Sequence, residues 1–192
     1  MGRPRLIIVC GVPGSGKSTF ALHVADRWGA IRFASETFAE ALGAAARTAL
    51  GDLSKEAILH AYAAMGAAVR DSLATNKLVV AVGSFRSEEQ RRRFWDIATS
   101  SGASATTVRI VCSVETAAKR IRSRRAIGER GPNEEAILQI DAALDRANDI
   151  DMVLTNESSV EEFHRKIDAL IQVLEWGSDR HESTAATMQR PG

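Results

Sequence analysis

A glycine-rich segment near the start of the chain has the residue types and the spacing of a phosphate-binding loop. Residues 11–18 read Gly-Val-Pro-Gly-Ser-Gly-Lys-Ser and fit the pattern G-x-x-x-x-G-K-[ST]. Glycines let the backbone curl so that successive N–H groups point toward phosphate oxygens, and the lysine adds a positive charge. The segment therefore predicts a site for a nucleoside triphosphate.

We predict that this loop and the hydroxyl that follows it bind ATP together with Mg²⁺. The residues expected to bind the nucleotide are Gly11, Pro13, Gly14, Ser15, Gly16, Lys17, Ser18 and Thr19. Lys17 is expected to reach the β and γ phosphates and to act in catalysis, and the Ser18 hydroxyl is expected to bind Mg²⁺. The pattern does not distinguish ATP from GTP.

The segments on either side of the loop have the order that the motif requires. Residues 6–10, Leu-Ile-Ile-Val-Cys, form an apolar run that predicts a buried strand. Phe20, Val24 and Trp28 recur at helical spacing after the loop. The alternative, a glycine-rich turn that fits by chance, does not explain a strand, a loop and a helix in this succession.

The rest of the chain alternates between apolar runs and amphipathic segments. The runs predict strands at 31–34, 78–82, 106–112 and 152–154, and the amphipathic segments predict helices from Ser35 and at 55–74, 87–100, 114–125, 134–147 and 160–174. Ser35, Ser54 and Ser113 are expected N-caps. Continuous apolar strands separated by helices predict an α/β fold of three layers: a five-stranded parallel sheet with helices on both faces. This is the fold of P-loop NTPases.

Composition limits the remaining possibilities. The chain has 192 residues, a net charge of +1 and 26% charged residues, so it lacks the overall positive charge that favours nucleic-acid binding. We expect one domain over 1–176, a flexible polar tail over 177–192, no membrane span and a cytoplasmic location. Cys10 and Cys112 are expected to be reduced, buried thiols. The oligomeric state is left open.

Two later segments, together with the loop, resemble the nucleoside-monophosphate-kinase-like branch of P-loop kinases over about 6–174. Residues 120–125, Arg-Ile-Arg-Ser-Arg-Arg, resemble the R-x-x-x-R start of the lid, and residues 151–156 resemble the last strand with its Asn-containing turn. The branch includes adenylate, dephospho-coenzyme A, gluconate and shikimate kinases and the P-loop domains of polynucleotide kinases. The resemblance implies a short helical lid at about 120–135 and a place for Asn156 beside the base.

The two lid arginines are expected to bind the nucleotide and to stabilise the transferring charge. In the branch one arginine packs on adenine and the next reaches the phosphates, which here implies Arg120 and Arg124. Four residues apart, they share one helix face, and a guanidinium can bind phosphate oxygens in bidentate fashion. The alternative is a solvated basic helix. The loop after them, residues 126–133, contains two glycines and a proline and is expected to be mobile.

Two positions depart from the pattern of the branch. Many members have an Asp after the second strand, where this chain has Glu36; we expect Glu36 to position the acceptor or act as a base, the alternative being a carboxylate that complements the helix dipole. The third strand usually ends in an Asp that holds Mg²⁺ through water, but here Val82 and Gly83 occupy its end and Ser84 follows. Arg86 is predicted to bind the acceptor, with a surface arginine as the alternative.

The run Arg91-Arg92-Arg93 is expected to be a solvated helix face, the alternative being a nucleic-acid-binding patch. Phe85, Phe94 and Trp95 are expected in the core, the alternative being a platform on which bases stack.

The sequence predicts a phosphotransferase that moves the γ-phosphate of ATP to a small-molecule or nucleotide acceptor. Catalysis would rest on positioning and electrostatics. One alternative is a nucleotide-binding regulatory module with weak or no transfer, which the missing Asp at Val82 favours. Another is a polynucleotide 5′-hydroxyl kinase, against which the near-neutral charge counts. The acceptor itself has no signature in the sequence.

Overall fold

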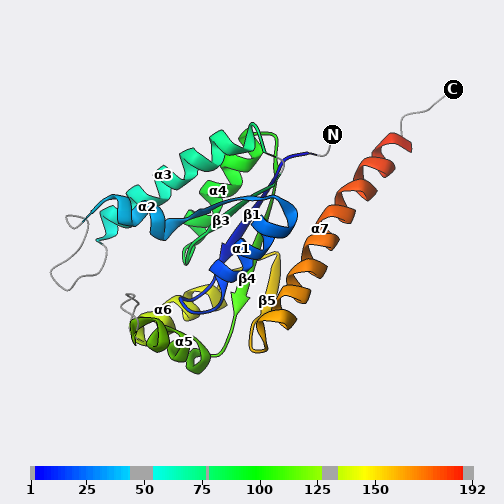
Figure 1. Cartoon of the computed structure of the whole chain (residues 1–192). Coiled ribbons are helices and arrows are strands. Elements are labelled where there is room, and N and C mark those ends of the chain that lie inside the picture. The colour runs from blue at the N-terminus through cyan, green and yellow to red at the C-terminus, as the bar shows by residue number, and fades with distance from the viewer. Residues whose placement is uncertain (1–2, 44–53, 77, 127–133, 188–192) are drawn as a thin grey trace. The chain divides into compact units, whose positions relative to one another are not determined.

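Five strands form one parallel sheet in the order β2-β3-β1-β4-β5 (Figure 1). The strands are β1 (Arg5–Cys10), β2 (Ile31–Ala34), β3 (Leu78–Val82), β4 (Ser104–Val111) and β5 (Met152–Thr155). The computed structural model describes residues 3–43, 54–76, 78–126 and 134–187. The chain divides into two units, 1–157 and 158–192, and the sheet lies in the first.

The register of the sheet brings the loops after its strands to one edge. Val9 of β1 is paired with Val82 of β3 and with Val108 of β4, and Val108 is paired with Met152 of β5. The segments that follow β1 and β3 therefore leave the sheet at the same level. In parallel α/β sheets this edge is where ligands bind.

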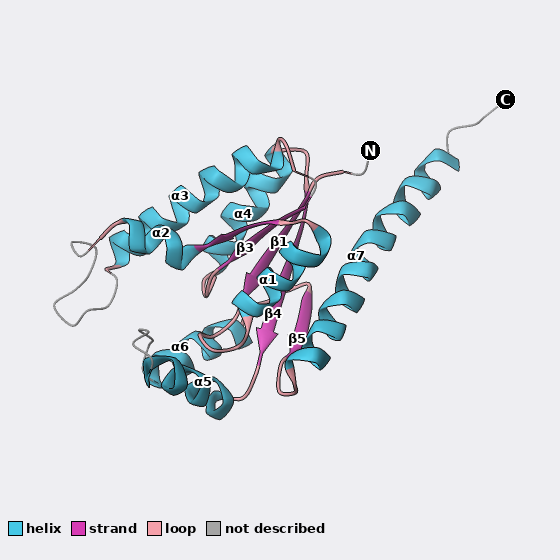
Figure 2. Cartoon of the chain, viewed as in Figure 1, coloured by secondary structure: helices cyan, strands magenta, loops and turns pink. Residues whose placement is uncertain are grey.

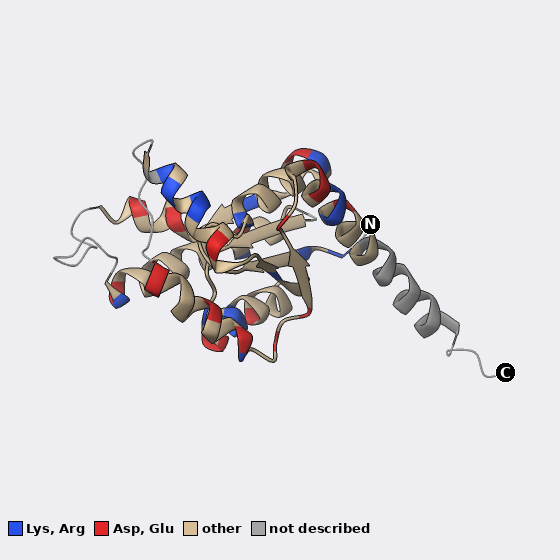
Figure 3. Ribbon diagram, turned by 90° about the horizontal axis from the view of Figure 1, so that it is seen from below, with Lys and Arg blue, Asp and Glu red and all other residues tan. Residues whose placement is uncertain are grey.

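Helices cover both faces of this sheet (Figure 2). They are α1 (Lys17–Trp28), α2 (Ser35–Ala41), α3 (Lys55–Leu73), α4 (Glu88–Ser100), α5 (Val114–Ala126) and α6 (Glu134–Asp145). Basic and acidic residues are interspersed along the helices (Figure 3), consistent with the net charge of +1.

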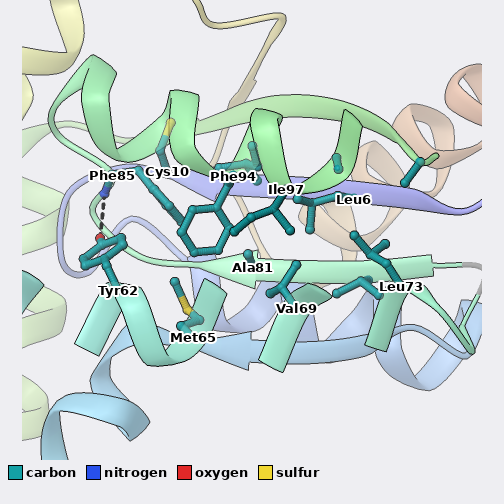
Figure 4. Packing of buried hydrophobic residues seen from close by; sticks show 14 of the residues in the cluster. Leu6, Cys10, Tyr62, Met65, Val69, Leu73, Ala81, Phe85, Phe94 and Ile97 are labelled. Carbon is teal, nitrogen blue, oxygen red and sulfur yellow. Dashed lines mark hydrogen bonds between the residues drawn. The ribbon is translucent and has the colours of Figure 1, made fainter. Parts of the chain in front are cut away.

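One core cluster lies between the sheet and the helices α3 and α4. Alternate residues of β1 face it, since successive strand residues point to opposite faces. The members shown in Figure 4 include Leu6, Cys10, Tyr62, Met65, Val69, Ala81, Phe85, Phe94 and Ile97. Tyr62, Phe85 and Phe94 contact one another edge to face, with centroids of Tyr62 and Phe85 5.0 Å apart. The prediction that Phe85 and Phe94 belong to the core is confirmed.

The predicted sheet and the element order are confirmed, and several helix ends differ from prediction. Helix α2 begins at Ser35 with Ala34 as its N-cap, so Ser35 is not the cap that was expected. Ser54 and Ser113 do accept capping hydrogen bonds, from the N–H groups of Ala57 and Thr116. Helix α6 ends at 145, two residues before the predicted end.

The second unit contains helix α7 (Val160–Thr187), which continues well past the predicted end near residue 174. The part of this helix after 177 is made mostly of small and polar residues, Ser, Thr, Ala and Arg among them, and holds no Gly or Pro before residue 187. Whether 1–176 behaves as one domain with a flexible tail stays a prediction. Among the described helices, none combines the length and the apolar character needed to cross a membrane.

Candidate nucleotide-binding site

The segment between β1 and α1 curls through three glycines with positive φ. Gly11, Gly14 and Gly16 have φ values of 145°, 83° and 108°. A Cβ on Gly11 would stand 2.4 Å from the Ile110 carbonyl oxygen, and one on Gly14 would stand 2.7 Å from that of Ala117. The glycines are therefore required both by the backbone conformation and by the closeness of the neighbouring backbone.

Helix α1 begins directly after this loop and presents its N-terminus to the same space. Its first turn contains no acidic residue that would neutralise the positive end of the helix dipole. The Ser15 side chain is fully buried, and within the described part of the chain its Oγ has no hydrogen-bond partner. A buried hydroxyl of this kind, beside the first N–H groups of a helix, which have no partner within the helix, fits an anionic ligand. The Ser18 hydroxyl, at the second position of the helix, is exposed.

Lys17 is buried at the mouth of the loop. Its Nζ donates a hydrogen bond to the Val12 carbonyl oxygen at 2.9 Å, and the side chain is 6% exposed. Burial lowers the pKa of Lys17, the Glu36 carboxylate opposes that shift, and Arg124 adds to it. Glu36 and Arg124 thus act electrostatically on the same ammonium group, although they lie in different helices, and both side chains are exposed.

Arg120 and Asn156 hold the outer side of the loop. Asn156 is buried, and its Nδ2 donates to the Ser15 carbonyl oxygen at 2.7 Å. Arg120 donates from Nη1 to the Gly14 carbonyl oxygen at 3.2 Å and from Nη2 to the Asn156 carbonyl oxygen at 3.3 Å. The sequence named both residues as nucleotide ligands, and the structure brings both to the loop. The contact of an arginine with adenine stays a prediction.

Hydroxyl groups gather at the end of β3, where the branch usually has an Asp. The Tyr62 hydroxyl accepts a hydrogen bond from the Phe85 N–H at 3.0 Å, drawn as a dashed line in Figure 4. A Cβ on Gly83 would stand 2.5 Å from this hydroxyl and 3.0 Å from the Ser35 Oγ. Burial raises the pKa of Tyr62, although hydrogen bonds with Ser84, Phe85 and Ser35 oppose the shift. Sequence reasoning found Ser84 but missed Tyr62 and Ser35, which come from other elements.

Phe85, just beyond that cluster, has a positive φ of 43° that a non-glycine residue rarely adopts. Its carbonyl oxygen accepts a hydrogen bond from Arg91 Nη1 at 2.6 Å. Arg91 also donates from Nε and Nη2 to the Asp149 carboxylate, at 2.7 and 2.5 Å. With its side chain 2% exposed, Arg91 is buried, so the prediction that it belongs to a solvated face was wrong. Arg93 is exposed, as expected.

The predicted acceptor residues are less defined by the structure. Ser35 Oγ donates to Glu36 at 3.4 Å, and Glu36 lies in the first turn of α2. Arg86 is exposed, two residues beyond Ser84. Their roles toward an acceptor stay predictions.

The lid and the cysteines complete the comparison with the sequence. The predicted mobile loop lies almost wholly at 127–133, outside the described residues, whereas α5 with both arginines is described. Cys10 is a buried free thiol, as predicted. Cys112 is also free but only half-buried, so the prediction that it is buried was wrong. Among the described residues, no group of three or more His, Cys, Asp or Glu side chains is arranged to hold a metal ion.

A parallel sheet of this order, with a glycine loop joining β1 to α1, defines a P-loop nucleotide-binding fold of the kinase-like type. Residues 6–147 match the model of the AAA domain family, and the chain belongs to that family. A search of curated proteins found no match.

Several solved structures share this fold at low sequence identity. The Mycobacterium tuberculosis APS kinase CysC, in complex with AMPPNP and APS, is 16% identical with a TM-score of 0.64, covering 90% of this chain and 99% of that one. A gluconokinase from Sinorhizobium meliloti 1021 is 20% identical with a TM-score of 0.61, covering 93% and 99%. A chain of the Pnkp1/Rnl/Hen1 RNA repair complex is 20% identical with a TM-score of 0.62, covering 78% of this chain and 48% of that one.

Proposed function

We propose that this protein is an ATP-dependent phosphotransferase that moves the γ-phosphate to a small-molecule or nucleotide acceptor. The observation that carries the proposal is the loop itself: three positive-φ glycines, a buried lysine and an unpaired buried Ser15 hydroxyl surround one helix N-terminus. Such an arrangement offers several donors to a chain of phosphates, and the first turn of α1 contains no acidic residue.

The residues around the loop have different roles in binding ATP, the phosphate donor. Lys17 exchanges its hydrogen bond to the Val12 carbonyl for one to the β and γ phosphates, since it is already buried at the mouth of the loop. Arg124, one helical turn after Arg120 on α5, would supply a second guanidinium to the charge on the transferring group. Arg120 and Asn156 keep the loop in the shape that accepts phosphate. Positioned charges of this kind account for most of the catalysis of phosphoryl transfer.

Magnesium fits the start of α1. The exposed Ser18 hydroxyl is the residue that would hold the ion beside the phosphates. When bound, Mg²⁺ neutralises developing charge on the phosphate oxygens.

The acceptor is assigned to the space beside α2 and α3. Glu36 acts electrostatically on Lys17 and on Tyr62, so its carboxylate is suited to orient an acceptor hydroxyl near the γ-phosphate. Arg86 is a ligand for an acidic acceptor. The likeness to kinases of APS and gluconate supports a small acceptor, while it leaves the acceptor unnamed.

A second candidate is a nucleotide-binding regulatory module with weak or no transfer. One observation favours it: the end of β3 has Gly83 and the neutral Tyr62 hydroxyl where a carboxylate usually holds the magnesium shell. A polynucleotide 5′-hydroxyl kinase is a third candidate, supported by the fold of a chain in an RNA repair complex and opposed by the net charge of +1.

The test is an ATP-binding and ATP-consumption assay with Mg²⁺, alone and with pools of nucleosides, nucleotides, sugars and 5′-hydroxyl oligonucleotides. Lys17→Ala should abolish binding, while Lys166→Ala on α7 serves as the matched control. Stimulation by one pool that is lost in the Lys17 variant would support a kinase and identify its substrate class. Binding without stimulated turnover would favour the regulatory module, and no binding at millimolar ATP would overturn the proposal.

A further inference from the structure

The turn after β5 contacts two other parts of the site through neighbouring residues. Asn156 holds the Ser15 carbonyl oxygen of the loop at 2.7 Å. Glu157, the next residue, accepts a short hydrogen bond from the Ser113 N–H and another from the Thr116 hydroxyl at 2.9 Å. One turn of chain thus joins the phosphate-binding loop to the N-terminus of α5.

At that N-terminus, Glu157 completes a cap that the local sequence provides only in part. The Ser113 Oγ accepts from the Thr116 N–H at 3.2 Å and donates to the Thr116 hydroxyl at 2.8 Å. The Ser113 N–H lies just before the helix, and the carboxylate of Glu157 satisfies it from 44 residues away. A negative charge at a helix N-terminus also complements the helix dipole. These hydrogen bonds lower the pKa of Glu157.

The same helix carries the arginines of the site on the face that Glu157 holds. Thr116, Arg120 and Arg124 follow one another at intervals of four residues, so they form a single stripe along α5. From this stripe, the Arg120 side chain donates hydrogen bonds to the carbonyl oxygens of Gly14 and Asn156. The loop, the turn and α5 are therefore joined in a closed ring of hydrogen bonds.

A ring of this kind restrains rotation of α5 about its own axis, in addition to the packing of Ala117, Ala118 and Ile121 against Val12 and Ile137. One residue corresponds to about 100° of rotation in an α-helix. Rotation of α5 by the equivalent of one residue would therefore turn Arg120 and Arg124 to a different side of the helix, away from the loop. Arg120 attaches the middle of α5 to the loop, and Glu157 attaches the start of α5 to the turn after β5. Together the two attachments restrain both the tilt of α5 and its rotation about its axis.

We propose that Glu157 is a positioning residue that sets the rotation of α5 and thereby holds Arg120 and Arg124 over bound nucleotide. The inference rests on the proposed function in one respect, that ATP binds at the loop. Glu157 itself touches neither nucleotide nor acceptor in this scheme and acts through the helix.

The test compares ATP affinity in Glu157→Ala and Glu157→Gln. Glu157→Ala should weaken ATP binding about tenfold, within the range of couplings between residues in contact. Glu157→Gln keeps an oxygen that accepts from the Ser113 N–H and should retain most of the affinity. The matched control is Glu115→Ala, which removes an exposed carboxylate from the same turn of α5 and should leave affinity unchanged.

A second background shows whether the effect passes through the arginines. In an Arg120→Ala/Arg124→Ala protein, adding Glu157→Ala should cause no further loss of ATP affinity. An equal tenfold loss in that background, or wild-type affinity in the Glu157→Ala single variant, would overturn the inference while leaving the proposed function intact.

Amide hydrogen exchange without nucleotide gives a readout that does not depend on ATP binding. Peptides covering 113–124 should exchange faster in Glu157→Ala than in wild type, with α1 and α4 unchanged. Unchanged exchange in those peptides would refute the inference that Glu157 holds the start of α5. If the wild-type protein does not bind ATP, the proposed function is refuted, and hydrogen exchange still tests whether Glu157 holds the start of α5.

Discussion

The buried ion pair between Arg91 and Asp149 offers the sharpest test of the structure. Removing the carboxylate with Asp149→Ala leaves a guanidinium that is 2% exposed, and among the described residues the Phe85 carbonyl is its one remaining hydrogen-bond partner. Breaking a buried pair by deleting one partner costs about 3–5 kcal/mol, because the other charge stays buried. Asp149 is 32% exposed, so water can enter beside the alanine, and we expect the low end of that range.

The expected loss of about 3 kcal/mol is measurable by urea and thermal unfolding. For a chain of this size each kcal/mol shifts Tm by about 2–4 °C, so Asp149→Ala should unfold about 6–12 °C below wild type. The matched control is Glu89→Ala, which breaks the exposed pair with Arg93 and should cost less than about 1 kcal/mol. The two variants remove the same kind of bond and differ in burial.

The double variant Arg91→Met/Asp149→Ala separates the lost attraction from the stranded charge. Methionine fills similar apolar space without a charge, so the double variant should recover most of the lost stability. Asp149→Ala within 1 kcal/mol of wild type would refute the burial of Arg91. A double variant as unstable as Asp149→Ala would show that the guanidinium is needed in itself, through its bond to Phe85.

Two further predictions concern other parts of the first unit. Gly83→Ala should destabilise the protein by about 1–3 kcal/mol in urea unfolding, because its Cβ would stand 2.5 Å from the Tyr62 hydroxyl; adding Tyr62→Phe should recover part of the loss, and no recovery would contradict the clash. Iodoacetamide at pH 8 should modify Cys112 before Cys10 in the native protein, as read by mass spectrometry, since burial raises the pKa of Cys10 to about 11. Faster reaction at Cys10 would contradict its burial.

Local sequence was enough to predict the sheet, the loop and the first helix. The two central strands are continuous apolar runs, residues 6–10 of β1 and all of β3, and the loop is defined by glycines that a positive φ requires. The stretch 31–34 was predicted with the same ends that β2 has. Arg120 and Asn156 were predicted to bind the nucleotide; their hydrogen bonds place both beside the loop, while their contact with a nucleotide stays a prediction.

The contacts that sequence reasoning missed join residues far apart in the chain. In a run of three arginines each side chain points about 100° from the last, and nothing local says that Arg91 turns inward. Its partner Asp149 is 58 residues away, and Glu157 finds Ser113 across 44 residues. The sequence around Tyr62 predicts only a helix at 55–74, because the hydroxyl reaches Gly83 through the packing of α3 against β3.

The hydrogen bond from Asn156 to the Ser15 carbonyl has a consequence for the peptide unit that follows. A trans peptide is planar, so the C=O of Ser15 and the N–H of Gly16 point in opposite directions. Gly16, with φ of 108° and no Cβ, would let this peptide flip and turn an oxygen toward the phosphates. By holding the oxygen outward, Asn156 keeps the hydrogen of Gly16 turned inward. A side-chain amide 141 residues further along the chain thus fixes the orientation of a single peptide bond in the loop.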